Sequence, residues 1–242
     1  MALFNCSFHN HTVLSPCAEI SMSSDLYKEL LLKSNINWLA ITDHNSTRNI
    51  RPFINYFSNT DIKIVPGIEV QTIEEVHVII LFNKLDEAEK FGKFIESSLI
   101  INKYDPEKFG YQICLNGEGD FEYILENPYL GSSSKYSINK LVMEAKKYET
   151  IVFPAHIFRA FGLITQLGLP PKDIEFDAVE VKNEKEIEFA KDLGFSNFIF
   201  GNDAHTPDEL NHFSCQVRAK NRSFIALKEA IYNKKVYPIW QH

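Results

Sequence analysis

The chain is poor in the features that mark membrane and secreted proteins. No apolar run approaches the length of a membrane span. The N-terminus lacks a charged region followed by an apolar stretch and a small-residue cleavage site, so we expect a cytoplasmic protein without membrane association. Only four cysteines occur, and their wide spacing predicts free thiols in a reducing compartment rather than a disulfide framework. They are Cys6, Cys17, Cys114 and Cys215.

Basic residues are also scarce relative to acidic ones. The 25 Lys and Arg residues face 32 Asp and Glu residues, which gives a net charge of −7. A broad nucleic-acid interface needs a basic surface that replaces counterions, so this charge argues against long nucleic acids as partners. A small phosphorylated substrate stays open, because bound divalent metals would reverse the local field at a site of carboxylates. The sequence leaves the oligomeric state open.

What the chain does contain is an alternation of short apolar runs and amphipathic stretches. Its 242 residues, 45% of them hydrophobic, predict one domain with a substantial core. Strands are predicted over 3–8, 37–42, 62–68, 76–82, 151–155, 177–181 and 197–201. Helices are predicted over 24–33, 46–57, 86–98, 137–148, 184–193 and 223–233, with Pro52 delaying or kinking the second. Such alternation predicts an α/β fold with a mainly parallel sheet, open or closed into a barrel.

Residues 102–134 interrupt this alternation. The segment is rich in Gly, Ser, Tyr and Asn and follows neither the helix nor the strand period. We interpret it as an irregular insertion within the single domain 1–242 and as a candidate lid. Its aromatic residues favour a local mini-core over a base-stacking platform. They are Tyr104, Phe109, Tyr111, Phe121 and Tyr123.

The histidines are the densest signal in the chain. Six of the eight lie in short motifs, most of which also hold Asp, Glu or a second His. Neutral imidazole and carboxylate are usual ligands of zinc, manganese and iron. Because the motifs lie too far apart for a local zinc finger, they predict a multinuclear metal site that the fold assembles. The motifs are Phe8-His9-Asn10-His11, Thr42-Asp43-His44-Asn45, Glu75-Val76-His77, Pro154-Ala155-His156 and Asn202-Asp203-Ala204-His205, and Pro66-Gly67-Ile68-Glu69 adds a carboxylate.

Most of these motifs come directly after predicted strands. In a parallel barrel the carboxyl ends of the strands share one face, which is where active sites assemble. His77 is the exception, because it lies at the start of its strand or inside it. We therefore expect the scattered side chains to converge at one mouth of the barrel.

Taken in order, the motifs resemble those of the polymerase and histidinol phosphatase (PHP) family. The resemblance covers nearly the whole chain and implies a distorted (β/α)7 barrel. It also implies two or three divalent metal ions (Zn, Mn or Fe) at the C-terminal ends of the strands. The matching motifs are H-x-H at His9 and His11, S-x-C from Ser15 to Cys17, T-D-H-N at Asp43 and His44, G-x-E at Glu69, then His77, P-A-H at His156 and D-A-H from Asp203 to His205.

Carried over position by position, the resemblance implies three ligand sets. The first is His9, His11, Glu69 and Asp203; in the second, Glu69 bridges to a metal held with His77 and His156; the third is Cys17, His44 and His205. Cys17 stands where relatives carry Asp or His, and a free cysteine is often only a small buried apolar residue. Ser7 replaces an Asp that is common in relatives, and Asn202 stands where Ser is common.

Three further residues are candidates for the chemistry. Arg159, three residues after His156, is predicted to clamp a phosphate, and Lys182, just past a strand, is the second candidate for substrate binding. Asp43, which we group with Arg159 as catalytic, is predicted to support a ligand histidine rather than to bind metal itself.

The resemblance implies a metal-dependent phosphoesterase. Such an enzyme would hydrolyse a phosphate ester of a small metabolite or nucleotide through a hydroxide that bridges two metals. The alternatives are a 3′–5′ exonuclease on short oligonucleotides and a non-catalytic metal-binding regulatory module. Metal-assisted hydrolysis of a C–N bond is a third possibility, but that class often bridges its metals with a carbamylated lysine, and here Glu69 takes the bridging position.

Overall fold

Strands and helices alternate along most of the chain in the computed structural model, which describes residues 1–101 and 103–239. The strands are β1 (Ala2–Ser7), β2 (Trp38–Ile41), β3 (Lys63–Gln71), β4 (His77–Phe82), β5 (Ile113–Leu115), β6 (Phe121–Ile124), β7 (Thr150–Pro154), β8 (Val179–Glu180), β9 (Phe198–Ile199), β10 (Cys215–Ala219) and β11 (Val236–Pro238). The helices are α1 (Ser24–Ser34), α2 (Ile50–Tyr56), α3 (Leu85–Glu96), α4 (Pro106–Phe109), α5 (Ile138–Ala145), α6 (Leu163–Leu167), α7 (Glu184–Asp192), α8 (Pro207–Leu210) and α9 (Phe224–Tyr232). The sequence pattern missed α6, α8, β10 and β11.

Local sequence explains where the helices begin and end. In α1 the Ser23 side chain accepts a hydrogen bond from the Leu26 N–H, and the helix stops at Asn35, whose φ of 56° is left-handed. Helix α2 begins only at Ile50, later than the predicted start at 46, and Pro52 lies in its first turn, where a missing N–H costs nothing.

The main sheet is mixed, which corrects the prediction of a mainly parallel one. Its order is β11-β10-β1-β2-β3-β4-β7. Strands β1, β2 and β3 are parallel, but β4 is antiparallel to both β3 and β7, and β10 is antiparallel to β1 and β11. Strand β7 therefore runs in the same direction as β3, and the start of β4 lies at the same edge as their ends.

The short parallel pair β8–β9 fills the gap between β7 and β1. The Asp177 N–H before β8 donates to Val152 O of β7 at 2.9 Å. After β9, Ala204 bonds the segment that follows β1, through His9 O (3.3 Å) and the His11 N–H (2.9 Å). The ring β1-β2-β3-β4-β7-β8-β9 confirms the distorted seven-stranded barrel, although its pairing is continuous only from β1 to β7.

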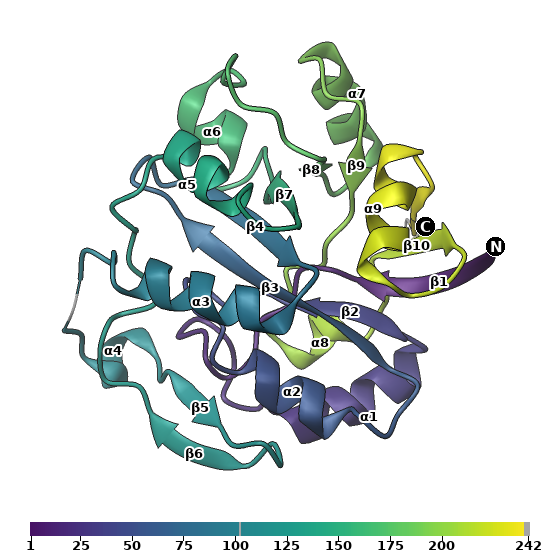
Figure 1. Ribbon diagram of the computed structural model, residues 1–242. Helices are drawn as coiled ribbons and strands as arrows, with labels where there is room; N and C mark the ends of the chain where they lie inside the picture. Colours follow the sequence, from purple (N-terminus) through teal and green to yellow (C-terminus); the bar gives the residue numbers. More distant parts are fainter. Residues whose placement is uncertain (102, 240–242) are drawn as a thin grey trace.

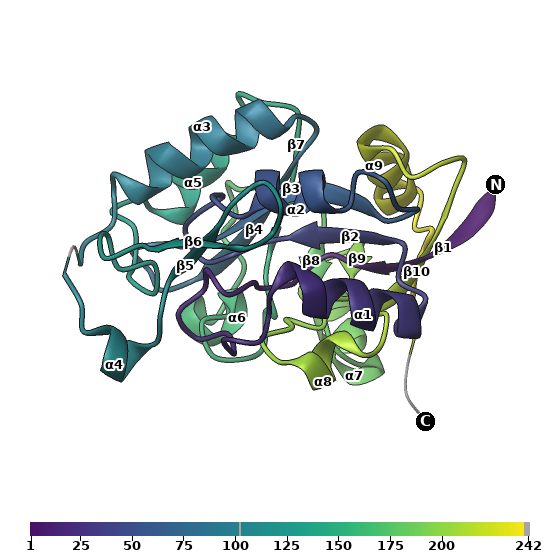
Figure 2. The same ribbon diagram turned by 90° about the horizontal axis from the view of Figure 1, so that it is seen from below.

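The core lies between this curled sheet and the helices packed around it. Helices α2 and α3 contact β3, α5 contacts β7, and α9 contacts β10 (Figure 1). Trp38 is fully buried. The rings of Phe4 and Phe8 pack edge-on against it, with ring centroids 5.9 and 5.6 Å from that of Trp38. Seen from below, the sheet is sandwiched between α3 and α5 on one side and α1, α7 and α8 on the other (Figure 2).

The insertion predicted over 102–134 has more structure than expected. Its described part, 103–134, holds α4 and the antiparallel hairpin β5–β6, at the end of the molecule away from the N-terminus (Figures 1 and 2). It is tied to the loops that follow β1 and β2: the Ile113 N–H donates to Val13 O, and Asn45 Nδ2 donates to Leu130 O. The insertion therefore borders the mouth of the barrel.

None of the helices that the structure describes combines the length and the hydrophobicity needed to cross a lipid bilayer. All four cysteines are free, as predicted.

Candidate metal centre

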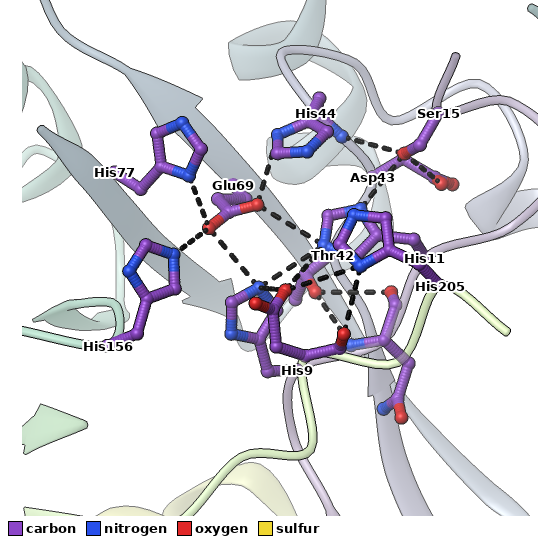
Figure 3. A network of polar contacts seen from close by, with 12 residues as sticks. His9, His11, Ser15, Thr42, Asp43, His44, Glu69, His77, His156 and His205 are labelled. Atoms are coloured by element: carbon purple, nitrogen blue, oxygen red, sulfur yellow. Dashed lines mark hydrogen bonds and ion pairs between the residues drawn. The ribbon is translucent and has the colours of Figure 1, made fainter. Parts of the chain in front are cut away.

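Four of the predicted ligands meet at one mouth of the barrel. His9 and His11 follow β1, Asp203 follows β9, and Glu69 lies inside β3, which continues three residues further than predicted. His9 Nε2 is 3.2 Å from Glu69 Oε1, 3.2 Å from Asp203 Oδ1 and 3.2 Å from His11 Nε2. His11 Nε2 is 3.2 Å from Glu69 Oε2. One ligand atom from each residue lies within 4.8 Å of the others, so the four could share one ion (Figure 3).

The outer ring nitrogens of both histidines are held by other side chains. His9 Nδ1 is 2.8 Å from Oε2 of Glu180, a buried residue of β8. His11 Nδ1 is 3.0 Å from Ser15 Oγ. The Ser15 hydroxyl donates its hydrogen bond to Asp43 Oδ1, with the two oxygens 2.8 Å apart. Toward His11 it can therefore act only as an acceptor.

These partners decide where the protons of the two rings lie. Carboxylate and hydroxyl acceptors place the N–H of His9 and of His11 on Nδ1, which leaves a lone pair on each Nε2. In the neutral rings these two lone pairs face the oxygens of Glu69 and Asp203. Four acceptors that converge in a buried space repel one another unless a cation lies among them. The donor set therefore fits a divalent metal.

The pKa values of the centre show that it attracts positive charge, from a proton or from a metal. Burial opposes a charge on His9, but Glu180, Glu69 and Asp203 outweigh it and raise its pKa. Burial is also outweighed at His11, where hydrogen bonds that the ring donates to Asp203 and Glu69 raise the pKa to about 9, so without metal the ring holds a second proton at the position that a metal would take. The pKa of Glu69 and that of Asp203 lie well below the usual range despite burial, because the histidines stabilise the carboxylates. The carboxylates thus create a negative field that favours a cation.

Two further groups of ligand atoms adjoin the first. His44 Nδ1 is 3.0 Å from Glu69 Oε2, and His77 Nδ1 is 3.0 Å from Glu69 Oε1, so Glu69 is shared between two groups. His11, His44 and His205 form the other group. Burial lowers the pKa of His44, and it lowers that of His205 to about 4, so both rings are neutral and able to act as ligands at neutral pH.

The geometry groups the remaining predicted ligands less closely. His156 Nε2 is 3.5 Å from Glu69 Oε1 but belongs to none of the three groups. Cys17 lines the cavity that opens onto this cluster, but it also lies outside the three groups. His11 instead occupies the position predicted for Cys17, beside His44 and His205. The ligand roles of His156 and Cys17 stay predictions.

Two predicted residues have other surroundings than expected. Asp43 is buried and bonds Ser15 and Thr12 rather than a histidine ring, so it acts on His11 only through Ser15. Lys182 is exposed and lines a separate cavity, next to Asn202 and Glu184. The structure does not bring Lys182 to the metal centre.

Glu180 is a residue of the centre that sequence reasoning missed. It is the last residue of β8 and the only charged one in the stretch Ala178-Val179-Glu180-Val181. A lone carboxylate in a short apolar strand is a signal for a buried partner, because an unpaired buried charge is costly. That signal names no partner, and His9 lies 171 positions away.

A cavity of about 390 Å³ opens onto the cluster. Arg159 lies on its wall, and its Nη2 is 2.5 Å from Asp203 Oδ2. Its Nε is buried and has no hydrogen-bond partner within the described part of the chain. The lining residues are Cys17, His44, His77, His156, Arg159, Ala160, Phe161, Asp203 and His205.

Comparison by sequence finds no relatives: no family model matches the chain, and no curated protein matches it. Comparison by structure does find similar proteins. A lesion-specific endonuclease from Pyrococcus furiosus superposes with a TM-score of 0.74 at 14% identity, over 96% of this chain and 56% of the endonuclease. This chain thus spans little more than half the length of that enzyme.

Two other similar structures match this chain over nearly their whole length. One, from Bifidobacterium adolescentis, is assigned as a metal-dependent phosphoesterase (TM-score 0.58, 13% identity, 94% of this chain and 95% of that one). The other is an amidohydrolase from Chromobacterium violaceum with bound sulfate and no metal (TM-score 0.56, 16% identity, 97% and 98%). At these identities the likeness shows the fold, and it confirms the barrel that the PHP resemblance implied.

Proposed function

We propose that the protein is a metal-dependent hydrolase that cleaves a phosphate ester of a small metabolite or nucleotide. The observation that carries this proposal is the sharing of Glu69. Its two carboxylate oxygens each face histidine nitrogens of neighbouring ligand groups at 3.0 to 3.2 Å. A carboxylate shared in this way is what a site for two adjacent metals requires.

The chain's own residues would divide the work as follows. His9, His11, Glu69 and Asp203 would hold one metal, and His44 and His77 would hold a second together with Glu69. Such ions supply a hydroxide nucleophile near neutral pH and stabilise charge on the phosphate oxygens. Arg159 would bind a non-bridging phosphate oxygen through the exposed part of its guanidinium, while its Nη2 stays on Asp203.

An exonuclease acting on short oligonucleotides is the second candidate. The endonuclease likeness favours action on nucleic acid, but this chain spans only 56% of that protein. The net charge of −7 favours a small substrate over a long duplex. Hydrolysis of a C–N bond, suggested by the amidohydrolase likeness, is less well supported, because Glu69 and not a lysine occupies the shared position.

The test is elemental analysis of the purified protein combined with hydrolysis assays on sugar phosphates, nucleoside monophosphates and short oligonucleotides. We expect two or three bound metals and release of inorganic phosphate. Arg159→Ala should raise KM about tenfold or more, the worth of a hydrogen bond to a charged group, without loss of metal. Arg51→Ala is the matched control, because Arg51 pairs with Glu89 and Asp86 on the surface. Bound metal without hydrolysis of any ester would refute the proposal.

A further inference from the structure

Phe161 is an aromatic residue on the wall of the metal-centre cavity, and the proposed chemistry does not use it. Its ring stacks on His77 with centroids 4.8 Å apart and planes at 7°. Its carbonyl accepts a hydrogen bond from the His77 N–H at 2.9 Å. The residue is nevertheless 39% exposed, and it lines the cavity. Since His77 covers one face of the ring, the exposed part is the opposite face and the edges.

The backbone holds this ring in place at some cost. Phe161 has a φ of 59°, a left-handed conformation that is a genuine outlier for a bulky residue. The turn is closed by the Arg159 N–H on His156 O and the Gly162 N–H on Arg159 O, both at 2.9 Å. A Cβ at Gly162 would lie 2.4 Å from His156 O, so the turn needs glycine there. The turn thereby places Arg159 and Phe161 on one wall, with a ligand histidine candidate before them.

We propose that Phe161 is a specificity-determining residue, whose free face stacks on a planar aromatic ring of the substrate while Arg159 binds the phosphate. The substrate class is then a phosphate ester that carries a flat ring, such as a nucleobase, rather than an aliphatic sugar phosphate. This inference rests on the proposed function, since it assumes that the phosphate lies at the metal centre.

One argument and two observations support the inference. Shielding His77 alone would need an apolar side chain but would not need an aromatic one with a free face. The cavity, at about 390 Å³, lies within the range of about 300 to 1,000 Å³ that holds small ligands. The guanidinium and the ring are two residues apart, so one ligand with a phosphate and a ring could reach both.

The test measures binding of two probes to the metal-loaded protein by calorimetry: adenosine 5′-monophosphate and ribose 5-phosphate. They share the phosphate and the sugar and differ in the base. Stacking of one base is worth about 1–3 kcal/mol, so the wild type should bind the nucleotide about 5- to 150-fold more tightly. Phe161→Leu should reduce this ratio to near one, and Phe161→Tyr should keep it. Phe189→Leu is the control, since Phe189 is 59% exposed on α7 and does not line the cavity.

Metal content is measured on every variant, because Phe161 also contacts His77. If Phe161→Leu loses metal, the decision passes to Phe161→Tyr: full metal content with no preference for the nucleotide would overturn the inference. A wild type that binds both probes equally or neither, or a Phe161→Leu variant that keeps metal and preference, would also overturn it. Failure of the proposed function is a separate result, namely no hydrolysis of any ester by a protein that still prefers the nucleotide through Phe161.

Discussion

Removing the carboxylate of Glu180 should weaken metal binding without unfolding the barrel. Glu180 lies outside the ligand groups, and its Oε2 holds His9 Nδ1 at 2.8 Å with both side chains almost fully buried. In Glu180→Ala the proton of His9 is free to move to Nε2, and the ring is free to turn. A protonated Nε2 cannot bind a metal, so each binding event must first restore the tautomer that Glu180 now imposes.

The size of the effect follows from this hydrogen bond. A buried hydrogen bond to a charged group is worth about 1.5–3 kcal/mol, and loss of such a partner of a metal ligand costs about 10- to 100-fold in metal affinity. We expect Glu180→Ala to fall in this range. Glu180→Gln should lose less, because the amide oxygen still accepts from Nδ1 although it carries no charge. Its volume also keeps the contact with Gly201, where an added Cβ would meet Glu180 Oε1 at 2.5 Å.

The assay is competition for zinc between the protein and a chromophoric chelator, with thermal unfolding of the metal-free protein measured in parallel. Glu96→Gln is the matched control, since Glu96 pairs with Arg48 and lies in none of the ligand groups. If Glu180→Ala binds zinc as tightly as the Glu96→Gln control, the argument from proton placement fails, and His9 is not held by Glu180 for ligation.

Three other outcomes can be checked on the same material. Glu69→Gln should abolish hydrolysis and lower the metal content while circular dichroism shows an intact fold; wild-type turnover would refute a shared carboxylate. Cys17→Ala should leave the metal stoichiometry unchanged, because the thiol lies outside the three ligand groups; loss of one metal would instead confirm the ligand role predicted from the sequence. Without metal, His11 with its pKa of about 9 contributes about 3 kcal/mol of stability that is present below pH 6.5 and lost as pH rises to 9. Thermal unfolding in chelator should show this loss, whereas metal affinity should rise over the same range as protons leave the ligands; a chelated protein that is equally stable at pH 6.5 and 9 would contradict it.

The convergence of the histidine motifs could be predicted because it follows from the direction of the strands. His9, His44 and Asp203 each come after a strand, and the ends of parallel strands meet at one edge. His77 did not fit that rule, since it begins its strand. The structure explains it: β4 is antiparallel to β3, so the first residue of β4 lies beside the last of β3, and Gln71 pairs with His77. Strand direction is set by tertiary pairing, which hydrophobic periodicity does not report.

The secondary structure of the insertion could not be predicted, for a related reason. Strand β6 is exposed at every position, so it shows no alternation of buried and exposed residues. Its pairing with β5 and the contact of Ile113 with Val13 come from the rest of the fold. Strand β10 was missed for no such reason, since Cys215-Gln216-Val217-Arg218-Ala219 alternates buried apolar residues with polar ones.

The residues that orient the ligands were the hardest to predict, although they decide what the site can bind. A motif such as H-x-H shows that two imidazoles are present but not which nitrogen of each is free. That depends on Glu180 and on Ser15. The Ser15 hydroxyl accepts from His11 because it donates its own hydrogen bond to Asp43. Asp43 was expected to contact a histidine, and instead it acts one hydrogen bond further out. Two buried carboxylates thus fix the protons of the H-x-H motif: Glu180 acts on His9 directly, and Asp43 acts on His11 through Ser15. Packing alone hardly explains this arrangement, whereas a metal at Nε2 requires it.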